Sequence, residues 1–310
     1  MQSGYNKWMD WSRVKLFYTD FAEVPMPQGH RFPMHKYRLL REALLHSQLI
    51  SPLQLHPAPK AQETDLLRAH DEHYVMGLKH GTLTEKEVRP IGLPMGPELF
   101  QRSLVSCGGF VAATHAALEV GYSALLAGGT HHAHRNSGEG FCVFNDFAVA
   151  ALKLIEERHL RRIIILDLDV HQGNGNSSIL GEREDVFICS VHGERNYPFR
   201  KVPSHLDVPL PEGTTDDEYL TTLERTLKIL PSGDLLLYQA GVDVLKADKL
   251  GTFHMTHAGV RERDRMVFEW TKSLGMPVAQ AIGGGYSDPI EESIKAYVGT
   301  IGAAREIFSI

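Results

Sequence analysis

The feature that most constrains the fold is a regular alternation of short apolar segments with longer segments of helical periodicity. The apolar segments predict strands at 14–18, 123–127, 162–170, 186–191, 234–241 and 277–285. The intervening segments predict helices at about 35–47, 97–120, 144–159, 216–230, 257–274 and 289–307. Because parallel strands need crossover connections, this repetition predicts an α/β fold in which a mainly parallel sheet is covered by helices on both faces.

Unusual polar residues follow four of these predicted strands. In chain order the polar segments are "GGTHHAH", "DLDVHQGNG", "GVD" and "GGGYS". In open α/β sheets, ligands bind beyond the carboxyl ends of the strands. The sequence therefore predicts that these segments meet at one edge of the sheet and form a site there.

Two aspartates and a histidine lie in the apolar segment "ILDLDVHQGNG" (165–175). On a strand, Asp167, Asp169 and His171 would project from the same face. Burying an unpaired carboxylate costs several kcal/mol, about 3–5, so these residues need a compensating partner. Asp169 and His171, together with Asp243, supply the three nitrogen and oxygen ligands of a catalytic zinc site. For an Asp-x-His motif alone, capping of the next helix is an equally good interpretation.

The adjacent histidines His131 and His132 and the tyrosine Tyr286 are candidate catalytic residues. One histidine can accept a proton from metal-activated water, while the other is held charged by a carboxylate, for which Asp167 is the natural candidate. Tyr286 follows three glycines, and its phenol could donate a hydrogen bond to a substrate oxygen. Taken separately, the histidine pair also fits a polar surface loop, and "GGGYS" fits an ordinary tight turn.

The overall composition excludes several classes of protein. The chain has 310 residues and a net charge of −6 without a basic cluster, which disfavours direct binding to nucleic acid or to an anionic membrane. Three cysteines without CxxC spacing predict reduced thiols. We find no signal peptide and no membrane span of roughly 18 apolar residues, and we expect a cytoplasmic protein. No linker divides residues 1–310, so a single domain is expected, and its oligomeric state is not indicated.

Four ordered motifs resemble those of the arginase-like zinc deacetylases, the histone deacetylase superfamily. The motifs are "GGTHHAHRNSGEGFCVFND" (128–146), "DLDVHQGNG" (167–175), "YQAGVDVLKADKLGTF" (238–253) and "GGGYS" (283–287). The form "DVHQGNG" is more similar to the class IV branch and its bacterial relatives than to class I. The resemblance implies the arginase/deacetylase fold, a three-layer α/β/α domain, with one zinc ion held by Asp169, His171 and Asp243.

The same resemblance implies an enzyme that removes an acetyl or longer acyl group from lysine side chains of proteins, or from a related acylated amine. His131 and His132 would activate water, and Tyr286 would polarise the amide carbonyl. The residues that match the family's substrate tunnel are Gly140, Phe141, Tyr197 and Leu250. A potassium ion is also implied, at a site matched by Asp167, Asp169, His171, Ser190 and Val191.

One residue departs from the pattern of many family members, because position 174 is an asparagine where they carry a carboxylate. His132 then lacks a charged partner, and a neutral amide supports an imidazolium less well than a carboxylate does. We therefore expect His132 to titrate lower than His131 and to serve as the base. His131, backed by Asp167, is expected to remain charged.

Two other functions fit the same residues. A small-molecule amidohydrolase acting on acetylated polyamines is one, although the polyamine-selective branch carries an acidic residue where this chain has Leu250. A binding protein that has lost its chemistry is the other, and the presence of every catalytic residue disfavours it. Fe(II) or Co(II) would accept the same ligands as zinc.

Overall fold

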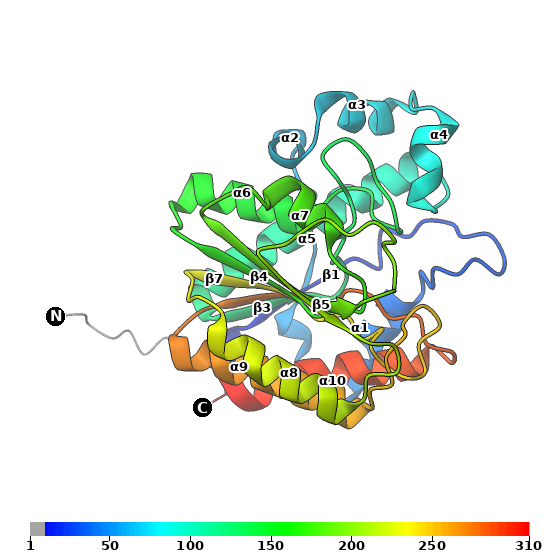
Figure 1. Ribbon diagram of the computed structural model, residues 1–310. Coiled ribbons are helices and arrows are strands. Elements are labelled where there is room, and N and C mark those ends of the chain that lie inside the picture. The colour runs from blue at the N-terminus through cyan, green and yellow to red at the C-terminus, as the bar shows by residue number, and fades with distance from the viewer. Residues whose placement is uncertain (1–9, 310) are drawn as a thin grey trace.

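A single sheet of eight parallel strands forms the centre of the protein (Figure 1). The computed structural model describes residues 10–309. The strands are β1 (Lys15–Tyr18), β2 (Leu55–Pro57), β3 (Tyr122–Leu125), β4 (Ile163–Asp167), β5 (Val186–Gly193), β6 (Leu206–Leu210), β7 (Leu235–Gln239) and β8 (Val278–Ala281). Their order in the sheet is β2-β1-β3-β8-β7-β4-β5-β6, and every pairing is parallel. The predicted α/β class is confirmed.

Helices cover both faces of the sheet and make the three layers expected (Figure 1). One layer contains α5 (Pro97–Val120), α6 (Asp146–Arg158) and α7 (Asn174–Leu180). The opposite layer contains α8 (Asp216–Ile229), α9 (His257–Leu274) and α10 (Glu291–Phe308), and α1 (Lys36–His46) packs against α10. The short helices are α2 (Glu63–Ala69), α3 (Glu72–His80), α4 (Glu85–Val88) and the 3₁₀ turns Trp11–Arg13, Pro52–Gln54 and Arg89–Ile91.

The central strands are buried on both faces, which explains their continuous apolar sequences. Every residue of β3, β4, β7 and β8 is buried. A strand covered by helices on both sides has no solvent-facing side chains, so strict alternation of polar and apolar residues is not required. The four central strands thus form a rigid base for the loops that follow them.

The strand predicted at 162–170 is shorter than expected, and this changes how two site residues are held. Strand β4 ends at Asp167, where its carboxylate Oδ1 accepts the backbone N–H of Asp169 at 3.2 Å. Asp169 Oδ1 in turn accepts the N–H of His171 at 3.1 Å. Such local side-chain hydrogen bonds compete with the strand ladder and curl the backbone. The prediction that Asp169 and His171 project from the same face of a strand is therefore wrong, because both lie on a loop.

The sequence also missed the two edge strands, β2 and β6. β2 has only three residues, and β6 lies between the strand predicted at 186–191 and the helix predicted at 216–230, where no element is predicted. Pro209 and the partly exposed residues of β6 give it little apolar character. Edge strands pair on one side only, so their sequences carry a weak signal. The short helices α2, α3, α4 and α7 were missed for a different reason, because none is longer than nine residues and so short a segment shows little helical periodicity.

Helix α5 is long and apolar enough to span a membrane, although the sequence analysis expected no such segment. It is the one such helix in residues 10–309. In the fold, 78% of its most apolar 18-residue window is buried. It packs against β1, β3, β8 and α6. Core helices of soluble proteins have the same composition, and the burial of α5 inside the fold accounts for its apolar character.

Candidate active site

The four polar segments converge because the strands that they follow are neighbours. β3, β8, β7 and β4 are adjacent in the sheet and parallel, so their carboxyl ends lie at the same edge. The loops after them carry the histidine pair, the glycine run, Asp243 and the Asp-x-His motif. The predicted convergence of the four segments at one edge of the sheet is confirmed by this strand order.

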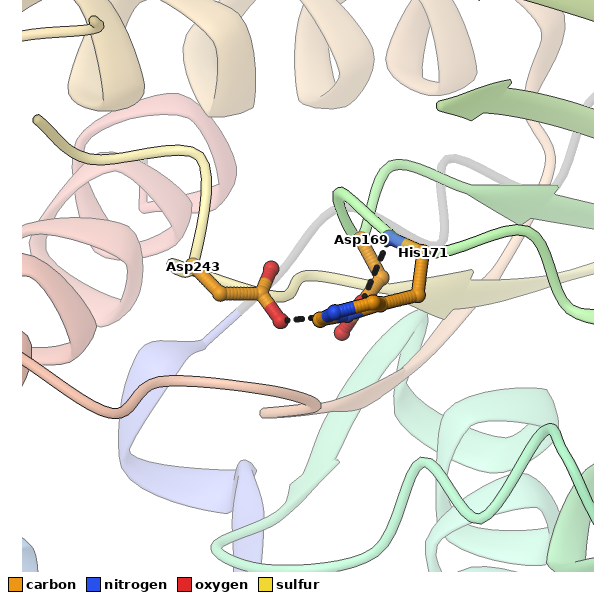
Figure 2. A group of neighbouring side chains, drawn as sticks. All are labelled: Asp169, His171 and Asp243. Atoms are coloured by element: carbon orange, nitrogen blue, oxygen red, sulfur yellow. Dashed lines mark hydrogen bonds and ion pairs between the residues drawn. The ribbon is translucent and has the colours of Figure 1, made fainter. Parts of the chain in front are cut away.

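Asp169, His171 and Asp243 form a compact buried cluster (Figure 2). His171 Nδ1 lies 3.0 Å from Asp169 Oδ1 and 3.1 Å from Asp243 Oδ2. The three candidate ligand atoms lie within 4.8 Å of one another. Figure 2 shows that Asp169 and His171 come from one loop and Asp243 from another, with both carboxylates directed at the imidazole.

The charges of this cluster fit a divalent cation. No lysine or arginine among residues 10–309 lies within 4.0 Å of the carboxylate of Asp169 or Asp243. Burial and the neighbouring Asp169 raise the pKa of Asp243 to about 7. A bound dication would remove this penalty, and one imidazole and two carboxylates are ligands that zinc accepts while leaving positions open for water and substrate.

The glycine run lets the backbone touch the carboxylates of the cluster. The N–H of Gly284 donates to Asp169 Oδ2 at 2.8 Å. A Cβ atom at residue 284 would come within 1.9 Å of Asp243 Oδ2, so a side chain there would displace the carboxylate. From the other side, the N–H of Val170 donates to Asp243 Oδ1 at 3.0 Å. Both carboxylates are therefore held in fixed orientations by backbone donors.

His131 has a carboxylate partner, as expected. Its Nδ1 lies 2.7 Å from Asp167 Oδ2, and both side chains are buried. Burial opposes protonation of His131, but the charges of Asp167 and Asp169 outweigh it and raise the pKa to about 9. The arrangement favours a charged imidazole at this position.

His132 instead contacts the amide of Asn174, whose Oδ1 lies 2.7 Å from His132 Nδ1. Burial, followed by the charges of His131 and His171, holds the pKa of His132 well below its usual range. A bound dication would repel a proton in the same direction. His132 is therefore neutral near pH 7, with the properties that we predicted for the base.

The orientation of the Asn174 amide is fixed by a residue that the sequence analysis missed. Asn174 Nδ2 donates to Glu139 Oε1 at 2.6 Å, and an ionised carboxylate only accepts hydrogen bonds. The amide oxygen must then face His132, where it accepts a hydrogen bond from Nδ1–H. This leaves the lone pair of neutral His132 on Nε2, which is the atom available to accept a proton.

Tyr286 is positioned by a second residue that we had not singled out. Its backbone N–H donates to Asp248 Oδ2 at 2.6 Å, and Asp248 Oδ1 accepts the N–H groups of Leu250 and Gly251. Asp248 thus ties the tyrosine loop to the loop that follows β7. Burial, together with Asp169 and Asp243, raises the pKa of Tyr286, so its hydroxyl stays protonated and able to donate. Asp248 lies within the quoted motif 238–253, but its spacing gave no sign of this contact.

All of the predicted tunnel residues line one cavity of about 480 Å³, which also contains the metal cluster, the histidine pair and Tyr286. These tunnel residues are Gly140, Phe141, Tyr197 and Leu250. The ring of Tyr197 lies edge-on to His132 with centroids 5.0 Å apart, and that of Phe141 lies 6.0 Å from Tyr286. A Cβ atom at Gly140 would approach His132 Cδ2 to 2.7 Å, so glycine is needed there.

The potassium site stays a prediction. Asp167 and Ser190 are paired in register between β4 and β5, and both are buried, as is Val191. Ser190 Oγ lies 3.0 Å from His192 Nδ1. These contacts bring the predicted residues together without showing a cation.

Comparison with known proteins decides the family. Residues 30–301 match the histone deacetylase domain. The chain belongs to the histone deacetylase family. It is 30% identical to the histone deacetylase-like amidohydrolase of Pseudomonas aeruginosa over 292 residues, which cover 86% of this chain and 75% of that protein. It is 29% identical to histone deacetylase 2 of Arabidopsis thaliana, over 89% of this chain and 75% of that protein. Membership implies a hydrolase of amide bonds.

A bacterial relative is more similar over its full length. The chain is 41% identical to an uncharacterized protein of Picosynechococcus sp., over 94% of this chain and 98% of that protein. Among solved structures, a histone deacetylase homologue from Aquifex aeolicus superposes with a TM-score of 0.81 at 24% identity, covering 95% of this chain and 88% of that chain. This last likeness confirms the deacetylase fold.

Proposed function

We propose that this protein is a zinc-dependent hydrolase that removes an acyl group from the side-chain amine of lysine or from a related amine. The observation that carries the proposal is the placement of the Asp169–His171–Asp243 cluster beside two histidines with different partners. All of these residues, with Tyr286, line the same cavity. A binding protein would not need this combination.

A zinc ion held by Asp169, His171 and Asp243 would supply Lewis acidity and lower the pKa of water to roughly 7. Neutral His132 would accept the proton of the attacking water at Nε2, because its Nδ1–H is donated to Asn174. His131, charged beside Asp167, would stabilise the negative charge that develops on the carbonyl oxygen. Tyr286 would donate its hydroxyl proton in a hydrogen bond to the same oxygen. The departing amine would then take a proton from the imidazolium of His132.

The walls of the cavity support an aliphatic acylated chain as substrate. Phe141 and Tyr197 contribute aromatic rings to the lining, and Leu250 adds an apolar side chain. Leu250 stands where the polyamine-selective branch carries an acidic residue, so this position has no negative charge to attract a cationic polyamine. One structural neighbour, a histone deacetylase homologue, was solved in complex with SAHA, at a TM-score of 0.79 and 24% identity. An acylated lysine side chain fits these walls better than a charged polyamine does.

The test is hydrolysis of an acetyl-lysine peptide, compared with an acetylated polyamine, by protein loaded with one zinc ion. We expect release of acetate from the peptide and loss of at least about 10²-fold in rate for Asp169→Ala. Glu184→Gln, which changes an exposed carboxylate away from the cavity, is the matched control. Faster hydrolysis of the polyamine would favour the small-molecule alternative, and no hydrolysis of any acylated amine would refute the proposed function.

A further inference from the structure

A buried part of the cavity lining is not used by the proposed chemistry. Its residues include Tyr37, Arg102, Ser103 and Ser106, each less than 9% exposed, and the backbone of Thr130 and its neighbouring glycines. Other lining residues are exposed, such as Phe199, which is 87% exposed. We call the buried part, defined by Lys36, Tyr37, Arg102, Ser103 and Ser106, the inner chamber.

Arg102 is a buried cation without a counter-ion. Its Nη1 donates to the backbone oxygen and the hydroxyl of Thr19, at 2.8 and 2.5 Å. Its Cζ lies 4.4 Å from the centroid of the Tyr37 ring. No carboxylate in the described part of the chain lies within 4.0 Å of the guanidinium; the nearby Asp20 is bound bidentately by Arg41. A buried charge with only neutral partners is costly unless something else compensates it.

A second buried cation shares the same aromatic ring. Lys36 Nζ lies 5.5 Å from the centroid of Tyr37, and it donates to the backbone oxygen of Gly285 and to the hydroxyl of Tyr297, at 3.2 and 3.3 Å. Neither hydrogen-bond partner is charged, although the carboxylates of Asp243, Asp248 and Asp169 act on Lys36 from the side of the metal cluster. The five residues that define the inner chamber thus include two cations and no carboxylate.

The hydroxyl of Ser106 supports a polar ligand. Ser106 is 7% exposed and lines the chamber, and it has no hydrogen-bond partner within residues 10–309. Its neighbour Ser103 donates to the backbone oxygen of Leu99 at 2.8 Å. An anion between Arg102 and Ser106 would satisfy both groups. A planar carboxylate matches the fork of a guanidinium, which binds it with two parallel hydrogen bonds.

We infer that the inner chamber binds the terminal carboxylate of an ω-carboxyacyl group, so that this enzyme prefers succinyl- or glutaryl-type amides to neutral acyl amides of equal length. The inference rests on the proposed amide hydrolysis. The carbonyl carbon would lie beside the metal cluster, and the far carboxylate would reach Arg102. In the reaction, the oxygen of water bonds to the acyl carbon, the C–N bond breaks and the nitrogen takes a proton. The products are a free amine and a dicarboxylate.

The primary test compares matched substrates on the zinc-loaded wild-type protein. One peptide carries succinyl-lysine or butyryl-lysine, and a second carries glutaryl-lysine or pentanoyl-lysine, so each pair differs in a single terminal group. We expect kcat/KM to be about 10- to 100-fold higher for the carboxylated member of at least one pair, since hydrogen bonds to charged groups have this strength. Equal or lower values in both pairs would overturn the inference.

Variants of Arg102 identify the chamber as the cause. Arg102→Met should lower the ratio of carboxyacyl to neutral-acyl kcat/KM by about tenfold or more, whereas Arg102→Lys should keep part of it. Arg161→Met, at an exposed arginine that does not line the cavity, is the control. A ratio unchanged in Arg102→Met would overturn the assignment to this residue. If Arg102→Met does not fold, the substrate ratio of the wild type decides alone.

Two failures are distinguishable. Absence of hydrolysis for every amide would refute the proposed function itself. Hydrolysis of neutral acyl groups without a preference for carboxyacyl groups would keep the function and refute the inner-chamber inference. Inhibition by free acetate that weakens in Arg102→Met, with no carboxyacyl preference, would also refute it, because the chamber would then receive only the released product.

Discussion

Asn174 joins His132 to Glu139: its amide oxygen lies 2.7 Å from His132 Nδ1, and its amide nitrogen donates to Glu139 at 2.6 Å. Many family members have a carboxylate in direct contact with the second histidine. In this protein the carboxylate of Glu139 contacts His132 only through the amide of Asn174. A neutral amide lies between the charge and the imidazole. Asn174 and Glu139 together therefore fix the tautomer of His132 without stabilising the charged form of its imidazole.

Replacing Glu139 should disturb this orientation. In Glu139→Ala, the amide of Asn174 loses its charged acceptor and keeps only the 3.2 Å contact of its Nδ2 with His134 Nε2, so the proton of His132 is held less firmly on Nδ1. We expect kcat to fall about tenfold, the lower end of the usual effect of losing a supporting partner, with a smaller change in KM. Glu139→Asp should recover part of the activity. NMR of labelled histidine should show a mixture of His132 tautomers, and a wild-type rate with a single tautomer would contradict this role.

Replacing Asn174 with aspartate should change the pH dependence. A carboxylate beside His132 favours the imidazolium and raises its pKa, so the base becomes protonated at higher pH than in the wild type. Activity is lost when the base is protonated. The acidic limb of the kcat/KM profile should therefore move to higher pH in Asn174→Asp. An unmoved limb would show that His132 is not the base.

Removing the hydroxyl of Tyr286 should slow the chemical step. Tyr286→Phe keeps the ring that packs near Phe141 but loses the hydrogen bond to the developing oxyanion. We expect turnover to fall by about 10²–10³, the usual scale for one such donor. Since the variant keeps its ring contacts, its thermal midpoint should stay close to that of the wild type. Wild-type turnover would exclude Tyr286 from the mechanism.

Metal binding should be visible as a change in stability. The two buried carboxylates have no lysine or arginine partner within 4.0 Å among residues 10–309 and share only the imidazole of His171, so zinc should raise the melting temperature of chelator-treated protein. A ligand at 100 times its Kd stabilises the native state by about 2.7 kcal/mol. Asp169→Ala and Asp243→Ala should lose this shift, and Glu184→Gln should keep it. Equal shifts in all variants would show that zinc binds elsewhere.

His70 should make the fold sensitive to acid. It is buried, its Nδ1 donates to the backbone oxygen of His134, and its Nε2 accepts the N–H of Asn145 at 2.9 Å. Burial lowers its pKa to about 4 from 6.5. Because the unfolded chain takes up the proton first, the free energy of unfolding should fall as pH falls from 6.5 towards 4, by up to about 3 kcal/mol.

Chemical denaturation of His70→Gln at several pH values measures this effect. The variant should be less stable at pH 7 but should show a flatter dependence of the unfolding free energy between pH 6.5 and 4.5. His80→Gln, an exposed histidine on the neighbouring helix α3, should behave like the wild type. If both variants have the wild-type slope, His70 does not titrate in this range.

The order and chemistry of the site could be read from the sequence because they depend on local pattern. Apolar segments mark β3, β4, β7 and β8, and parallel topology places their carboxyl ends at one edge. The metal-ligand residues and the histidine pair follow those strands directly, so their convergence was predictable. The length of β4 could not be predicted. The carboxylates of Asp167 and Asp169 accept hydrogen bonds from the backbone two residues further on, and the strand ends before its apolar sequence does.

The partners of the site residues were decided only by the tertiary structure. Glu139 reaches Asn174 across 35 positions, and Asp248 reaches Tyr286 across 38. Arg102 of α5 meets the ring of Tyr37 on α1. No periodicity or spacing signals such pairs, since a hydrogen bond or a ring contact depends on where the folded chain places two distant side chains. The sequence determined which chemistry the chain can perform, and packing decided how the histidines are oriented and what charge lies in the buried part of the cavity lining.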